Sequence, residues 1–218
     1  MSHRARRNRA ATTQSPTRKS RRNSVTKTIE TLVTSLLLAL LAKHMLIQAF
    51  RIPSGSMEDT LLIGDFLFVN KMIYGIPIPF SHYRLPEIRE PRRGDIIVFK
   101  PPHSEKDFIK RCVAVENDTL RYINNILYVN GERVDEPYKC VKQNPNAPPG
   151  YHMDIRSPVV VPKGHIFMMG DNRNNSADSR SWGPLPVDRI KGKAMAIYMS
   201  VDLANKRLRF SRIGKIIR

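Results

Sequence analysis

One apolar run divides this chain into two unlike parts and limits what it can fold into. Residues 31–42 contain no charged side chain, and after Lys43 and His44 the apolar sequence resumes at 45–50. The stretch is long enough to cross a bilayer as a helix of about 20 residues if Lys43 reaches the interface. We therefore predict a disordered basic tail at 1–28, a transmembrane helix at 29–50 and a folded domain at 51–218.

Three interpretations of the run compete. A cleaved secretory signal has the same basic front and apolar centre. A helix in a protein core would show an apolar stripe, whereas this run is apolar on nearly all sides. We favour an uncleaved signal anchor, because flanking Lys and Arg residues hold a segment on the cytoplasmic side. In this interpretation the protein crosses the membrane once, and everything after Phe50 lies outside the cytoplasm.

The charge of the chain narrows the choice of partners. The net charge is +18, and residues 1–50 hold half of it, with ten Lys or Arg against Glu30 alone. An excess of this size points to nucleic acid or to an anionic membrane surface. The tail lacks the interleaved aromatic residues of a base-stacking segment. We therefore expect no nucleic acid partner, and we expect the rest of the charge to favour anionic membrane lipids.

After Phe50 the pattern changes to short apolar runs separated by turn residues, which is typical of β-strands. Asn124-Asn125 and Asn130-Gly131 fit the two-residue turns of hairpins. Residues 138–157 are rich in Pro and Asn and predict a small excursion or accessory lobe. The fold class is thus mainly β, with strands expected at Phe66–Asn70, Asp95–Lys100, Phe108–Val115, Leu120–Ile123, Ile126–Val129, Val159–Val161, His165–Met169 and Ala194–Met199.

Metal and cofactor signatures are absent from the sequence. There is no HExxH, no CxxC and no glycine-rich phosphate loop, and the six histidines lack ligand spacing. We expect neither a metal nor a cofactor. Cys112 and Cys140 could form a disulfide outside the cytoplasm, or Cys112 could be an inert buried thiol.

Three segments carry polar groups that could do chemistry, and each also has an ordinary interpretation. Ser54-Gly55-Ser56 can bring a hydroxyl and an N–H to one point, but it is also common linker sequence. Lys110 lies inside a strand-like run, where burial would make it a base and exposure would make it inert. Residues 168–183 are dense in short polar side chains, which also form rigid polar loops.

Together these segments resemble the bacterial type I signal peptidases, or leader peptidases, which are membrane-bound serine proteases with a Ser–Lys dyad. The resemblance rests on four segments in the family's order, at 53–57, 93–100, 108–111 and 170–180. It implies a barrel-like β-sheet protease domain. Ser56 corresponds to the nucleophile and Lys110 to the general base. The Ser54 hydroxyl and the Ser56 N–H correspond to the donors that stabilise the oxyanion.

The resemblance assigns further roles by position. Ser176 matches the serine that orients the lysine, and Asp171, Asp178 and Arg180 match residues that brace its loop. It implies that the substrates are secretory preproteins, cut after a small-x-small site at the bacterial cytoplasmic membrane. The positions that match the apolar substrate pocket are Phe50, Ile52, Met57, Leu61, Val98 and Ile109. Asp59-Thr60-Leu61 replaces the usual Pro-Thr-Leu, which changes a turn rather than the chemistry.

Three alternatives remain open at this point. A self-cleaving repressor shares the Ser–Lys chemistry but would need a soluble N-terminal domain instead of an apolar run. A specialised conjugative or pilin-processing peptidase belongs to the same superfamily. A basic, membrane-anchored binding protein without catalysis would use none of these side chains chemically.

Overall fold

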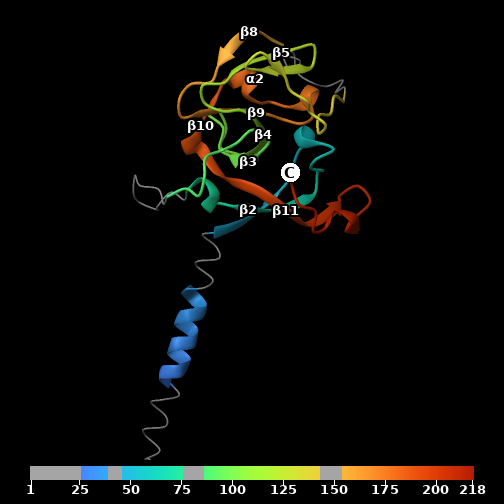
Figure 1. The fold of residues 1–218 in the computed structure, drawn as a ribbon. Helices are drawn as coiled ribbons and strands as arrows, with labels where there is room; N and C mark the ends of the chain where they lie inside the picture. Colours follow the sequence, from blue (N-terminus) through green and yellow to red (C-terminus); the bar gives the residue numbers. More distant parts are fainter. Residues whose placement is uncertain (1–25, 39–45, 76–85, 143–153) are drawn as a thin grey trace, which may run out of the picture. The chain divides into compact units, whose positions relative to one another are not determined.

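Figure 1 shows a computed structural model of the chain, which describes residues 26–38, 46–75, 86–142 and 154–218. The chain separates into two compact units, residues 1–43 and residues 44–218. Each unit is described by itself.

The first unit contains a helix at residues 26–38 whose side chains are all exposed. The hydroxyls of Thr31 and Thr34 donate hydrogen bonds to the carbonyls of Lys27 and Glu30, four residues earlier, at 2.9 and 2.8 Å. In the ranges that the structure describes, no helix combines the length and the hydropathy that crossing a membrane requires. Most of the predicted basic tail, residues 1–25, lies outside these ranges.

The end of the predicted helix at 29–50 is wrong. Ile47–Arg51 forms strand β1, and its five residues pair with β2 in antiparallel register. Hydropathy marked this segment as apolar, but an apolar run alone does not distinguish a strand from a helix. The second unit therefore begins with a strand that directly precedes the Ser54-Gly55-Ser56 segment.

The main sheet of the second unit has eight strands in the order β1-β2-β11-β3-β4-β9-β10, with β12 paired to β11. The long strand β11 joins its two halves; its pairing with β2 has bulges after Ala194 and Ile197, and its pairing with β3 has one after Ile190. Its strands are β1 at Ile47–Arg51, β2 at Asp65–Asn70, β3 at Ile96–Phe99, β4 at Phe108–Ala114, β9 at His165–Met169, β10 at Leu185–Pro186, β11 at Ile190–Asp202 and β12 at Arg207–Leu208.

A second, smaller sheet has four strands in the order β7-β6-β5-β8. In Figure 1 the labelled strands β5 and β8 lie together at the far end of the unit from β2 and β11. The four strands are β5 at Thr119–Ile123, β6 at Ile126–Val129, β7 at Glu132–Arg133 and β8 at Ile155–Val160. Of the expected excursion at 138–157, residues 155–157 belong to β8, and residues 143–153 lie outside the described ranges.

Two asparagine-rich turns build the small sheet as the sequence predicts. Asn124 and Asn125 have φ angles of 50° and 61°, and they connect β5 to β6. Asn130 and Gly131, with φ angles of 54° and 86°, connect β6 to β7. Positive φ at both positions is the requirement of a type I′ hairpin turn, and Asn and Gly meet it with the least strain.

The mainly β fold class is confirmed. All eight expected strands have a counterpart, although β8 begins earlier than the expected Val159–Val161 and β11 is longer than Ala194–Met199. The sequence did not predict β1, β7, β10 or β12. Helical segments of the second unit are single turns, namely η1 at Gly55–Met57, η2 at Met72–Tyr74, η3 at Arg173–Asn175, α2 at Ser179–Trp182, η4 at Val187–Arg189 and η5 at Phe210–Arg212.

Three apolar clusters form the core, and the first of them supports the segment after β1. This cluster contains Ile52, Met57 and Leu61 together with Val98 and Ile109. Met57 and Leu61 are completely buried, so they fix the turn η1 from below. The second cluster packs on one face of β4. The third fills the space between β4 and the small sheet.

Candidate active site

Ser56 lies in the single turn η1, which follows β1 and Ile52. Its side chain is 6% exposed. The carbonyl of Ser56 accepts a hydrogen bond of 3.1 Å from the backbone N–H of Asn172, which ties the turn to the loop after β9. The backbone of the turn is therefore fixed to that loop at Ser56 itself.

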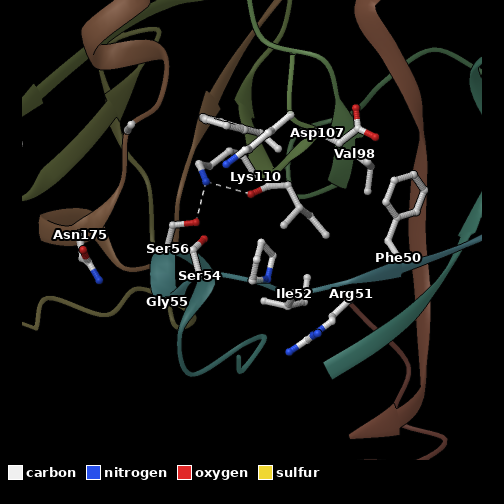
Figure 2. A pocket seen from close by; sticks show the side chains of 15 residues that line it. Phe50, Arg51, Ile52, Ser54, Gly55, Ser56, Val98, Asp107, Lys110 and Asn175 are labelled. Carbon is white, nitrogen blue, oxygen red and sulfur yellow. Dashed lines mark hydrogen bonds between the residues drawn. The ribbon is translucent and has the colours of Figure 1, made fainter. Parts of the chain in front are cut away.

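Lys110 lies on β4, and its ammonium group reaches the Ser56 hydroxyl. Lys110 Nζ is 2.6 Å from Ser56 Oγ and 3.1 Å from the carbonyl oxygen of Ile109. Figure 2 shows both contacts as dashed lines, with the two side chains pointing toward one another. The structure thus brings together the two residues that the sequence singled out 54 positions apart.

Burial changes the acidity of Lys110. The side chain is 4% exposed, and this desolvation lowers its pKa from 10.5 to about 8. The carboxylates of Asp178 and Asp171 oppose this change, while the positive charge of Arg180 adds to it. Because loss of the proton becomes easier, a part of the lysine population is neutral near pH 7 and can accept a proton from a neighbouring hydroxyl.

Asp178 and Arg180 close the polar loop after β9. Asp178 caps α2, accepts bonds from Arg180 Nε at 2.8 Å and Nη2 at 2.9 Å, and accepts another from the N–H of Gly170 at 3.0 Å. Burial raises the pKa of Asp178, but these donors outweigh it and the pKa is lowered. The predicted bracing pair is therefore present as a buried ion pair.

Asp171 pairs with an arginine to which the sequence assigned no role. Arg111 Nε and Nη2 donate to the Asp171 carboxylate at 2.8 and 2.7 Å, and both side chains are almost completely buried. Thr60 Oγ1 donates to the same carboxylate at 2.6 Å. Arg111 follows Lys110 directly in β4, so the loop is fastened to the strand that carries the lysine.

Ser176 lies in the site but does not make the contact that the resemblance implies. Its hydroxyl is buried and makes no hydrogen bond to any group that the structure describes, Lys110 included. It lies near enough to Asp178 to lower the pKa of that carboxyl, although the geometry of a hydrogen bond is not met. A Cβ atom at Gly170 would be 2.2 Å from Ser176 Oγ and 2.5 Å from the carbonyl of Ser56. Only glycine at 170 allows this close approach.

A cavity of about 380 Å³ opens beside the Ser56–Lys110 pair. Of the predicted pocket residues, Phe50, Ile52, Val98 and Ile109 line it, whereas Met57 and Leu61 do not. Those two side chains are fully buried in the cluster below η1, because their side of the turn faces the core. The residues that line the cavity are Phe50, Arg51, Ile52, Pro53, Ser54, Gly55, Ser56, Val98, Lys106, Asp107, Phe108, Ile109, Lys110, Asn175 and Ala177.

Ser54 precedes η1 and is exposed to the cavity. In Figure 2 its side chain lies next to that of Ser56, on the same side of the turn. A hydroxyl at this position can donate to an oxygen that approaches Ser56 Oγ from the cavity. The arrangement therefore provides a hydroxyl, an amine of lowered pKa and a second donor around one open space.

Sequence reasoning missed a second buried ion pair behind the loop. Arg173 pairs with Glu136 through Nη1 and Oε2 at 2.9 Å, and the two side chains are 0% and 2% exposed. Arg173 is part of the Gly170–Arg180 segment, so its place near the site was visible in the sequence. Glu136 was not, because it is 37 residues away in an unremarkable stretch.

Both cysteines are free and buried, so the disulfide alternative does not hold in this structure. Cys112 lies on β4, where burial raises the pKa of its thiol. This agrees with the alternative of an inert core thiol. Within the described ranges no group of three or more His, Cys, Asp or Glu side chains is placed to hold a metal ion.

Comparison with known proteins gives consistent matches. A family model described as signal peptidase, peptidase S26, matches residues 25–199. Signal peptidase I of Pseudomonas aeruginosa is 38% identical over 220 residues, covering 83% of this chain and 75% of that protein. Signal peptidase I of Aquifex aeolicus is 34% identical, covering 80% of this chain and 84% of that protein. A crystal structure of a signal peptidase I from Enterococcus faecalis is 32% identical and covers 49% of this chain and 98% of that chain, with a TM-score of 0.41.

Proposed function

Because the chain belongs to the signal peptidase family, peptidase S26, we propose that it is a membrane-anchored endopeptidase that removes signal peptides from secretory preproteins. Its class as a serine peptidase follows from the family. The reacting groups and the anchor are assigned from its own residues. The observation that carries the assignment is the 2.6 Å contact between Lys110 Nζ and Ser56 Oγ at a buried lysine.

Lys110 acts as the general base. With a pKa of about 8, roughly one lysine in ten is neutral at pH 7. The neutral amine takes the proton of Ser56 Oγ, and the oxygen attacks the carbonyl carbon of the scissile peptide bond. The ring of Phe108, 5.3 Å from Nζ, favours the ammonium that results.

Ser54 and the backbone N–H of Ser56 stabilise the oxyanion of the tetrahedral intermediate. Such donors lie where negative charge develops, in a site that excludes most of the water. Lys110 then gives its proton to the leaving amine, and the signal peptide remains as an ester on Ser56. The side chain of Lys110, which is then neutral again, takes a proton from a water molecule. This water hydrolyses the ester and restores Ser56.

The preprotein binds along the cavity as an added strand. β1 is the first strand in the sheet order, so one of its edges has no partner strand among the described residues. Phe50 and Ile52, from β1 and the residue after it, and Val98 and Ile109 line the cavity and form an apolar pocket. A strand that lies here presents alternate side chains to the pocket, which fits small residues before the cut.

The anchor is the apolar segment before β1, in the bacterial cytoplasmic membrane, with the tail in the cytoplasm and the catalytic domain outside. The exposed Leu36, Leu37 and Leu38 of the helix at 26–38 fit this assignment, because large apolar side chains left in water are unfavourable. Since β1 begins at Ile47, we place the end of the anchor before that residue. Anionic lipids are the expected partner of the domain after Phe50, which carries the other half of the net charge.

The test is cleavage of a preprotein and of a peptide with a small-x-small site by purified Ser56→Ala and Lys110→Met variants. We expect both to lose at least about 10³-fold in kcat, because each removes one half of the nucleophile–base pair. Lys106→Met is the matched control, since this exposed lysine lines the same cavity without contacting Ser56. Wild-type processing by Ser56→Ala or Lys110→Met would overturn the assignment.

A further inference from the structure

The segment that leaves the small sheet after β7 contacts the site from behind. Glu136, Tyr138 and Cys140 come from this connection, and none of them lines the cavity. Each contacts β4 or the loop after β9. The segment 136–140 is called the brace below.

The first contact leads to Ser56. Glu136 holds Arg173 in the buried ion pair described above, and Arg173 Nε donates to the carbonyl of Gly170 at 3.0 Å. Gly170 in turn packs so closely on the carbonyl of Ser56 that any side chain there would collide with it. A displacement of Arg173 would therefore move the residue on which the nucleophile turn rests.

The second contact leads to Lys110. The ring of Tyr138 stacks on Arg111, with the guanidinium carbon 3.7 Å from the ring centroid. Arg111 is the neighbour of Lys110 in β4, and its other partners are the Asp171 carboxylate and the carbonyls of Gly94 and Arg218. An aromatic face at this distance favours a guanidinium and fixes its plane.

A third contact runs through the backbone. Cys140 donates its N–H to the carbonyl of Asp171 at 2.8 Å and accepts from the N–H of Arg173 at 2.9 Å. This short parallel bridge faces Asn172, whose own N–H donates to Ser56 at 3.1 Å. The brace is thus paired with the loop after β9 through backbone hydrogen bonds, as two neighbouring strands would be.

We propose that the brace sets the relative position of Ser56 and Lys110, and that Glu136 and Tyr138 are positioning residues for the reaction. This inference rests on the proposed function of that pair. Because the brace lies behind the reacting groups and outside the cavity, its loss acts on kcat and leaves KM unchanged. Small displacements of reacting groups cost about 10- to 100-fold in rate.

The experiment compares Tyr138→Leu with two controls in the full-length protein, using the small-x-small peptide. Tyr138→Phe keeps the ring on Arg111 and loses only the 3.2 Å hydrogen bond to Glu136. Tyr128→Leu removes a half-buried tyrosine from β6 of the small sheet, outside the brace. We expect kcat of Tyr138→Leu to fall about tenfold with KM within about twofold, while both controls keep kcat within about twofold.

A second pair of variants tests the ion pair. Glu136→Gln keeps an acceptor for Arg173 but removes the charge, and Glu132→Gln on β7 is the exposed control. We expect the same fall in kcat for Glu136→Gln only. The circular dichroism spectrum and the thermal midpoint of each variant show whether it is folded.

The proposed role of the brace would be overturned if a folded Tyr138→Leu variant kept its kcat. It would also be overturned if Tyr128→Leu lost as much kcat, or if the loss in Tyr138→Leu were a change in KM. If Ser56→Ala remains inactive in the same assay, that result leaves the proposed function intact. If Ser56→Ala is active, the proposed function fails, whatever the brace variants do.

Discussion

Lys110 and Arg111 are neighbours on β4, and both are buried. They differ in whether a carboxylate lies next to the side chain. Successive side chains of a strand point to opposite faces. Arg111 meets the carboxylate of Asp171, whereas Lys110 meets the hydroxyl of Ser56 and a carbonyl. Of the four buried basic side chains in the described part of the chain, the three arginines have a carboxylate partner and Lys110 has none.

This difference explains how one strand can fasten the loop after β9 and also carry the base of the proposed mechanism. A buried charge is stable when a well-placed opposite charge replaces its water. A buried lysine without such a partner loses its proton more easily instead, as the lowered pKa of Lys110 shows. The paired face holds the loop, and in the proposed mechanism the unpaired face provides the base.

The largest expected effect comes from making the unpaired face permanently charged. In Lys110→Arg the side chain keeps its length and cation but cannot lose a proton near neutral pH. We expect kcat to fall about 10³-fold or more, as measured with the small-x-small peptide. Lys106→Arg at the rim of the cavity is the control. If Lys110→Arg kept a tenth of the activity, proton transfer to residue 110 could not be the role of this side chain.

Breaking the pair on the other face should reduce stability. Arg111→Met leaves the fully buried carboxylate of Asp171 without its partner. We expect the free energy of unfolding, measured with urea, to fall by about 3–5 kcal/mol. Lys142→Met breaks the exposed ion pairs with Glu58 and Asp59 and should leave the urea midpoint unchanged. Equal stability of wild type and Arg111→Met would show that the pair does not hold the loop.

The smallest expected effect concerns the cavity beside the Ser56–Lys110 pair. Val98 lines this cavity, whereas Leu61 is buried below it. In Val98→Phe the pocket is partly filled, so KM for the small-x-small peptide should rise about tenfold. Leu61→Met conserves volume in the core and should leave KM unchanged. A larger change in KM for Leu61→Met than for Val98→Phe would show that Leu61, and not Val98, contributes to the substrate pocket.

Local signals predicted much of the fold. The asparagine turns at 124–125 and 130–131 depend on φ angles that their own residues favour, and the structure contains both. The strand-like pattern around Lys110 was equally local. The start of the second unit was not predicted, because the apolar residues 47–51 become a strand only by pairing with β2.

The site was predictable where it depends on motifs and unpredictable where it depends on packing. The resemblance identified Ser56, Lys110 and the loop at 170–180, and these lie together in the structure. It also placed Met57 in the pocket, but the direction of a side chain in a tight turn depends on the core beneath it. Glu136 and Tyr138 come from the connection after β7, and no periodic pattern marks such long-range partners.

The pH dependence of kcat/KM for the small-x-small peptide tests most directly whether the unpaired lysine is the base. In the proposed mechanism catalysis requires neutral Lys110, so activity should be lost as the pH falls below its pKa. Between pH 5 and pH 10 we expect kcat/KM to rise through a single ionisation with a pKa of about 8. A value of kcat/KM that stays constant from pH 5 to pH 9 would contradict the account.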